Sequence, residues 1–183
     1  MWRRNDASRV REPIRRVARA LPVVFVLHDL EEVLAATWWT RNGERILTGA
    51  HPWLPSGLVR AATRTTTPQM AVATSVVGLG VAVVTATALV GGRERPLRAA
   101  TLVFAAHGIT HLAGSISVRS YTPGAVTAAL VVLPWGSRAL RQLRPTDQRD
   151  SGTRRRDTMA VAASSIAAVT GGHAVGRRVC RKE

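Results

Sequence analysis

The chain contains 183 residues, 46% of them hydrophobic, and carries a formal net charge of +15. Its hydrophobic residues fall in blocks of about twenty, the length of a membrane-spanning helix, rather than in short alternating strands. The positive charge comes almost wholly from arginines that flank these blocks, which favours an anionic membrane surface over nucleic acid as the partner. The single cysteine, Cys180, excludes an intramolecular disulfide.

The first apolar block follows an arginine-rich start. Residues 1–20 are expected to form a basic flank on the cytoplasmic side, and the first span is expected from Leu21 to about Thr40. Trp38 and Trp39 lie at the far end of this span, as in the aromatic belt at a membrane interface. Because ionisable residues soon interrupt the apolar run, an uncleaved signal-anchor fits it better than a cleaved signal peptide.

Glycines and prolines recur through residues 41–68, and we expect them to break any long regular element and leave a loop there. The second span is expected from Gln69 to Val90. This stretch has no ionisable side chain, and its many small residues allow close contacts between helices.

Two further spans are predicted after a basic turn. The third covers about residues 97–118, and the fourth covers about residues 122–135. Thr122 followed by Pro123 is typical of a helix N-cap with proline at the first helical position, so this pair is the predicted start of the fourth span.

Arginine placement predicts the orientation, because the cytoplasmic side of membrane proteins accumulates basic residues. The amino end, the turn at residues 91–98 and the segment after residue 135 are densely basic, so four spans with both ends in the cytoplasm fit best. Residues 141–183 are interpreted as a basic linker and tail, in which Met159–Val175 is either a weak fifth span or a surface-lying helix. We therefore predict an all-α, multi-pass protein of the cell membrane, with a bundle of four transmembrane helices over residues 21–140.

Four ionisable side chains interrupt the first span, within the run His28-Asp29-Leu30-Glu31-Glu32. A charge at the centre of a bilayer costs at least about 2.5–3.5 kcal/mol, so isolated, unpaired charges are not tolerated there. The third span offers candidate partners, because His107 and His111 interrupt it at a spacing of four.

The two groups of polar residues are expected to meet. Helical geometry places His28 on one face of the first span with Glu31, three residues on, and Glu32, four residues on, and it places His107 and His111 on one face of the third. Each pair begins nine residues after an arginine at the cytoplasmic end of its span, which is about 13.5 Å of helix. Both spans run outward from the cytoplasm, so the pairs should lie at the same level in the bilayer.

Imidazole and carboxylate groups ligate zinc and non-haem iron, and a bound dication would neutralise buried glutamates. The sequence therefore predicts one divalent metal ion, zinc or non-haem iron, bound by His28, Glu32, His107 and His111. Glu31, turned about 100° from Glu32 on the helix, is the candidate catalytic general base or an alternative ligand. Asp29 is expected to orient a histidine, and Tyr121 is expected either to anchor the chain at the interface or to face the site.

One set of motifs resembles a known family. The chain has His28-x-x-Glu31-Glu32 early in a small polytopic sequence, a later pair of histidines, and Tyr121-Thr122-Pro123-Gly124 at the start of a later span. Together these resemble the HXXEE-domain family of bacterial membrane proteins, over about residues 20–140. The resemblance implies a polytopic membrane protein and marks His28, Glu31 and Glu32 as motif positions, but it implies no reaction.

Several functional classes fit these residues. The first is a membrane enzyme that uses the metal to hydrolyse or oxidise a lipid or another apolar small molecule. The second is a proton- or cation-coupled transporter, since intramembrane carboxylates and histidines also form ion pathways, although the second and fourth spans show no polar track. The third is a haem cytochrome, but two histidines four residues apart, backed by glutamate, fit a compact metal ion better than one haem. A structural membrane protein without catalysis is the remaining alternative.

Overall fold

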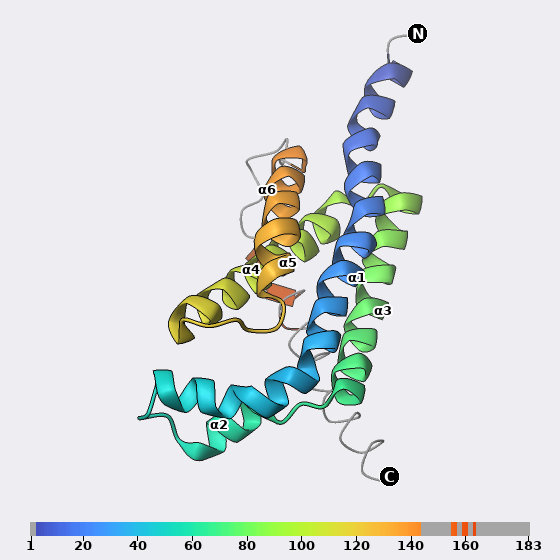
Figure 1. The fold of residues 1–183 in the computed structure, drawn as a ribbon. Coiled ribbons are helices and arrows are strands. Elements are labelled where there is room, and N and C mark those ends of the chain that lie inside the picture. Colours follow the sequence, from blue (N-terminus) through green and yellow to red (C-terminus); the bar gives the residue numbers. More distant parts are fainter. Residues whose placement is uncertain (1–2, 144–154, 157–158, 161–162, 164–183) are drawn as a thin grey trace.

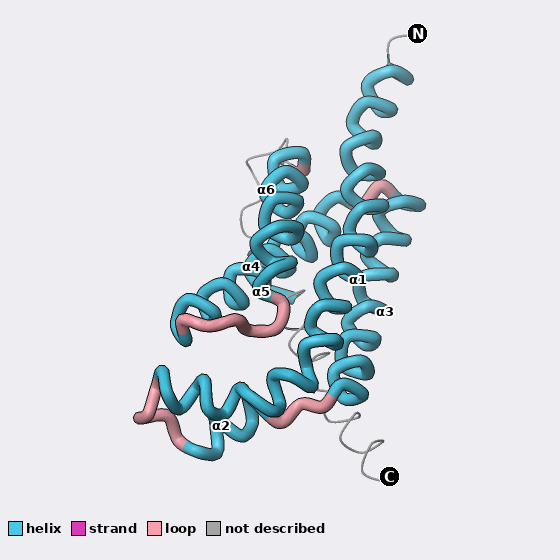
Figure 2. The backbone as a smooth tube through the Cα atoms, viewed as in Figure 1, coloured by secondary structure: helices cyan, strands magenta, loops and turns pink. Residues whose placement is uncertain are grey.

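The computed structural model describes residues 3–143 and, beyond these, residues 155–156, 159–160 and 163. In these ranges every regular element is a helix and none is a strand, which confirms the predicted all-α class (Figure 2). The weak fifth span predicted at Met159–Val175 lies outside the described residues, but for 159–160 and 163. The elements are α1 (Arg3–Ala50), α2 (Ser56–Thr63), α3 (Thr67–Gly91), α4 (Glu94–Val118), α5 (Ala125–Thr127), the π-helical turn η1 (Ala128–Val132) and α6 (Leu133–Gln142).

The long helices alternate in direction. α3 runs antiparallel to α1 and lies beside it, whereas α4 crosses obliquely and contacts both of them (Figure 1). The chain then returns along α4 through α5, η1 and α6. This order of directions is the one that the predicted bundle requires.

α1 continues to Ala50, past the predicted end of the first span, so the expected loop is wrong at its start. Gly43 does not break the helix. A Cβ at this position would lie 2.8 Å from Cε2 of Trp39 and 3.0 Å from Cγ2 of Thr63, so the glycine allows α2 to pack closely against α1. Glycine inside a helix costs only about 1 kcal/mol relative to alanine, which such packing offsets.

One stripe of α1 is buried, and its residues recur at the spacing of three and four that one helix face requires. The first half of the stripe is apolar and packs against the other helices to form the core. The core consists of Ile14, Val17, Ala18, Leu21, Val24 and Phe25 of α1, Ala88 of α3, Leu97 and Phe104 of α4, Val132 of η1, Ala139 of α6, and Leu143. The stripe then continues through His28 and Glu32, whose exposed fractions are 0% and 8%. Two polar residues thus occupy positions that would otherwise be apolar core.

Among the described helices, α3 and α4 are long and apolar enough to cross a membrane, by length and composition. Only 11% of the most apolar stretch of α3 and 28% of that of α4 are buried inside the protein. The first and fourth predicted spans do not share this character, because α1 carries three carboxylates in its apolar segment and the last stretch is divided into α5, η1 and α6. For these two segments a membrane span stays a prediction.

The last helical stretch begins after Gly124, so the N-cap predicted at Thr122 is wrong. Gly124 has φ = 83°, a left-handed conformation that glycine adopts without steric cost. In η1 the N–H group of Leu133 donates to the carbonyl of Ala128, five residues earlier. Pro134 follows directly and has no N–H group to donate four residues back, which is a local reason for the wider turn before it.

Candidate metal centre

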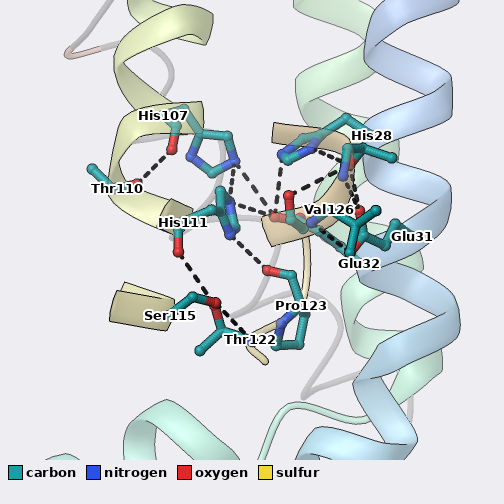
Figure 3. Close-up of polar contacts among 12 residues, drawn as sticks. His28, Glu31, Glu32, His107, Thr110, His111, Ser115, Thr122, Pro123 and Val126 are labelled. Carbon is teal, nitrogen blue, oxygen red and sulfur yellow. Dashed lines mark hydrogen bonds and ion pairs between the residues drawn. The ribbon is translucent and has the colours of Figure 1, made fainter. Parts of the chain in front are cut away.

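Four side chains of metal-ligand type converge between α1 and α4 (Figure 3). His28 and Glu32 lie one turn apart on α1, and His107 and His111 lie one turn apart on α4. One ligand atom from each of the four lies within 4.8 Å of all the others. The structure therefore brings together the two pairs that the sequence places at equal depth, and we call these four residues the His/Glu cluster.

The Oε1 atom of Glu32 contacts all three imidazoles of the His/Glu cluster. It lies 2.7 Å from Nε2 of His111, 3.5 Å from Nε2 of His107 and 3.6 Å from Nε2 of His28. The Nε2 atoms of His107 and His111 are 2.9 Å apart. Ligands placed tetrahedrally at about 2.0–2.1 Å from a zinc ion lie about 3.3 Å from one another, a value that falls within the range of these four separations.

In a neutral ring, the hydrogen bond of His111 to Pro123 leaves the ligand nitrogen Nε2 without a proton. Nδ1 lies 2.7 Å from the carbonyl oxygen of Pro123, which can only accept, so Nδ1 carries the proton of a neutral ring. Nε2 then presents its lone pair to the carboxylate of Glu32, which is also an acceptor. Two acceptors at this distance repel each other unless a proton or a metal cation lies between them.

The burial of the cluster is uneven. Nε2 of His28 is buried and forms no hydrogen bond within the part of the chain that the structure describes. A buried polar atom without such a partner costs about 1–3 kcal/mol, and ligation of a metal would offset this cost. By contrast, 44% of the His107 side chain is exposed. The ring of Phe104, with centroids 5.5 Å from His28 and 6.4 Å from His107, forms an apolar wall beside both. The cluster is therefore closed around His28 and accessible at His107.

Gly124 fits between two of the imidazole rings. A Cβ at this position would lie 2.8 Å from Nδ1 of His111 and 3.0 Å from Cε1 of His28. Both distances are shorter than an ordinary contact, so any side chain here would displace one ring or both. The absent side chain of Gly124 thus creates part of the space in which the rings lie.

Glu31 is not one of the four converging residues, and its carboxylate binds the start of the last helical stretch instead. Its Oε2 atom accepts hydrogen bonds from the backbone N–H (2.7 Å) and the hydroxyl (2.5 Å) of Thr127. Its Oε1 atom accepts from the Tyr121 hydroxyl (2.9 Å) and the Val126 N–H (3.2 Å). A carboxylate at this place satisfies amides that have no partner inside the helix. The role of Glu31 as general base stays a prediction.

The two remaining predicted site residues differ in their contacts. Tyr121 donates to Glu31, and its ring packs against Trp38 with centroids 5.3 Å apart. Burial and the bond to this carboxylate raise the pKa of the Tyr121 hydroxyl, which keeps it a donor. Among the described residues, no hydrogen bond joins Asp29 to a histidine, so its orienting role stays a prediction without a contact to support it.

Sequence reasoning missed two residues that shape the site. The hydroxyl oxygen of Thr127 lies 2.8 Å from Nδ1 of His28, and no pattern in the sequence singles out this threonine within its apolar stretch. Gly124 belongs to the motif Tyr121-Thr122-Pro123-Gly124, which does point to the right segment. Its fit between the rings follows only from the three-dimensional contacts.

The comparison with protein families agrees with these motifs. A model for proteins of unknown function with an HXXEE motif matches residues 19–138. The chain belongs to this HXXEE family. The matched range runs from the end of the basic flank into α6 and includes the whole His/Glu cluster. No curated protein and no solved structure matches the HXXEE protein.

Another histidine of the HXXEE protein lies apart from the cluster. Nε2 of His51, in the segment after α1, is 2.8 Å from the hydroxyl oxygen of Ser117 at the end of α4. His51 therefore provides a matched control for experiments on the clustered histidines.

Proposed function

We propose that this HXXEE protein is a multi-pass membrane protein whose His/Glu cluster binds one divalent metal ion, zinc or non-haem iron. The metal serves the hydrolysis or oxidation of a lipid or another apolar small molecule. The observation that carries the proposal is the convergence of four ligand atoms within 4.8 Å, two of them on fully or largely buried residues of α1.

The surface around the cluster supports a membrane location. α1 exposes Leu30 (51%) and Leu34 (71%) beside the motif, and α3 exposes Leu79 (70%) and Val83 (62%). Large exposed apolar side chains such as these are unfavourable in water and are ordinary on the surface of a helix in lipid. Together with the arginine-rich flanks, these exposed apolar side chains support a topology of four spans with the amino end in the cytoplasm.

The donor set narrows the choice of metal. Three imidazoles and one carboxylate, without a thiolate, suit zinc or non-haem iron. If all four residues ligate zinc tetrahedrally, no position stays open for a substrate, whereas iron accepts more ligands and keeps open positions. The exposed side of His107 is where a substrate would approach. An iron-dependent oxidation is therefore the reaction that leaves all four protein ligands in place.

The residues of the chain have separate tasks in such a reaction. The metal, when bound, supplies Lewis-acid or redox chemistry. The His/Glu cluster binds it, and Phe104 keeps water from the side of His28 and His107 on which its ring lies. In the hydrolytic alternative, Glu31 is the candidate general base.

Elemental analysis of the detergent-purified full chain tests the proposal. Wild type, His28→Ala, His107→Ala and the control His51→Ala are measured together by ICP mass spectrometry, with optical spectra of the same samples. We expect near-stoichiometric zinc or iron in wild type and in His51→Ala, and loss of the metal in both cluster variants. Iron rather than zinc would direct the search for substrate toward oxidation.

Absence of metal from folded wild-type protein, also after incubation with zinc and with iron(II), would refute the proposal. A shared proton would then be needed to hold the close pair of His111 and Glu32, which lie 2.7 Å apart. The leading function would become proton or cation transport through the same residues.

A further inference from the structure

Thr127 is the residue that connects the HXXEE motif of α1 with the last helical stretch. Its hydroxyl oxygen lies 2.8 Å from Nδ1 of His28 and 2.5 Å from Oε2 of Glu31. Its backbone N–H also donates to Glu31, at 2.7 Å. The side chain is thus held in place by one motif residue while it contacts another.

The direction of these hydrogen bonds follows from the number of protons available. A threonine hydroxyl has one proton to donate, and a carboxylate that receives four donors is held in its ionised, accepting form. Apart from His28 itself, the acceptors among the described residues are the charged Oε2 of Glu31 and the more distant carbonyl of Gly124, at 3.4 Å, so the hydroxyl proton goes to Glu31. In either case Thr127 accepts toward His28, so Nδ1 of a neutral His28 ring must carry the proton.

This assignment determines the state of the other ring nitrogen. A neutral imidazole has one N–H, so Nε2 of His28 carries a lone pair. In the described part of the chain this buried Nε2 forms no hydrogen bond, and it lies 3.6 Å from Oε1 of Glu32. His28 and His111 therefore reach the same state by different means, one through the hydroxyl of Thr127 and the other through the carbonyl of Pro123.

We propose that Thr127, held by Glu31, is a positioning residue for His28. It fixes the tautomer and the orientation of the ring, and it thereby raises the metal affinity of the His/Glu cluster. Glu31 is then the remote end of a chain from carboxylate to hydroxyl to imidazole to metal. The inference rests on the proposed metal site, but its statement about the tautomer of His28 holds for the metal-free protein and is testable there.

The first measurement is the tautomer itself. Long-range ¹H–¹⁵N NMR spectra of histidine-labelled, metal-free protein in detergent distinguish a ring protonated at Nδ1 from one protonated at Nε2, and His28→Gln assigns the signal. We expect the Nδ1-protonated form for His28 in wild type. A predominantly Nε2-protonated ring in folded wild-type protein would overturn the inference without the use of any Thr127 variant.

The second measurement is zinc affinity, by competition with a chromophoric chelator. Thr127→Val has nearly the same shape but cannot accept from Nδ1, whereas Thr127→Ser keeps the hydroxyl. Loss of a group that orients a metal-binding histidine lowers affinity about 10–100-fold. We expect a loss of this size for Thr127→Val, near wild-type affinity for Thr127→Ser, and an intermediate loss for Glu31→Gln, which keeps the shape but not the charge.

The outcomes separate this inference from the metal site. Equal zinc affinity of Thr127→Val and wild type would refute the positioning role and leave the site intact. Binding of neither zinc nor iron(II) by wild type would refute the proposed function, while the NMR measurement would still decide the tautomer. If Thr127→Val does not fold, the wild-type spectrum and the comparison of Thr127→Ser with Glu31→Gln decide the question.

Discussion

Substitution of Gly124 with alanine tests whether the His/Glu cluster is a preformed site. The new Cβ would lie 2.8 Å from Nδ1 of His111, about 0.6 Å closer than the 3.4 Å at which ordinary contact begins. It would also lie 3.0 Å from Cε1 of His28. Because Gly124 has φ = 83°, the alanine further pays the left-handed penalty of about 1–2 kcal/mol.

The expected result combines a moderate loss of stability with a larger loss of binding. The backbone penalty, with some strain from the two rings, predicts a decrease of about 1–3 kcal/mol in the free energy of unfolding. A ring displaced by about 0.5 Å no longer holds its nitrogen at ligand distance, so zinc affinity should fall at least about tenfold. Chelator competition measures the affinity, and thermal unfolding in detergent measures the stability.

Gly80→Ala is the matched control, because Gly80 lies in α3 and a Cβ there would meet no atom within 4 Å. Alanine at a helical position should leave stability unchanged or raise it by up to about 1 kcal/mol. If Gly124→Ala binds zinc as tightly as Gly80→Ala does, the rings adjust freely and the reasoning from their packing is wrong.

Three further predictions follow from the same contacts. Glu32→Gln removes the carboxylate that contacts all three imidazoles and should lower zinc affinity more than about tenfold. The control Glu44→Gln changes an exposed residue of the same helix and should not lower it. Equal affinities of the two variants in chelator competition would contradict this prediction. Phe104→Ala empties a core position beside His28 and should clearly lower the midpoint of thermal unfolding, because Phe→Ala costs about 3–5 kcal/mol in well-packed interiors. The control Leu79→Ala changes a side chain that is 70% exposed and should alter this midpoint little. A reporter that works only in the cytoplasm should be active when it is fused at the amino end or after α6. A reporter that works only outside the cytoplasm should be active when it is inserted between α1 and α2, and the opposite pattern would invert the proposed topology.

The meeting of the two ligand pairs could be predicted from the sequence, because the prediction uses helical periodicity and the positions of the flanking arginines. The buried stripe of α1 places Leu21, Phe25, His28 and Glu32 on one face, and each position follows from its neighbour by three or four residues. The pair His107 and His111 repeats the same spacing. Regular helices carry such information over many residues, and the equal distances from the flanking arginines predict that the two pairs lie at the same level.

The contacts of Glu31 could not be predicted from the sequence, for the opposite reason. They depend on the irregular segment between α4 and α5, where Gly124 adopts a positive φ and delays the start of the helix beyond Thr122. Local sequence favours a threonine N-cap at this place. The structure replaces that cap with a carboxylate from α1, more than ninety residues away in the chain. A local pattern cannot reveal a partner so distant.

The sequence predicts too early an end for α1, because glycine and proline are weak evidence for a break when a second helix packs at the same place. In the sequence alone, Gly43 indicates a break in the helix. In the structure, its missing side chain allows Thr63 to approach closely, which helps to hold α2 against α1. The propensity cost of one glycine is about 1 kcal/mol, which tertiary contacts readily outweigh. A sequence without its partners therefore shows the cost of the glycine and not the contact that offsets it.

The HXXEE motif becomes intelligible when its two glutamates are considered separately. Adjacent residues on a helix diverge by about 100°, so they cannot serve one site from the same direction. Glu32 faces the imidazoles of α1 and α4, and Glu31 faces the amides and hydroxyls at the start of α5. Each carboxylate thus has its own set of polar partners, and tolerance of charge within an apolar segment requires such partners. Thr127, one of the donors to Glu31, also contacts His28, so the motif joins three helical segments at one point.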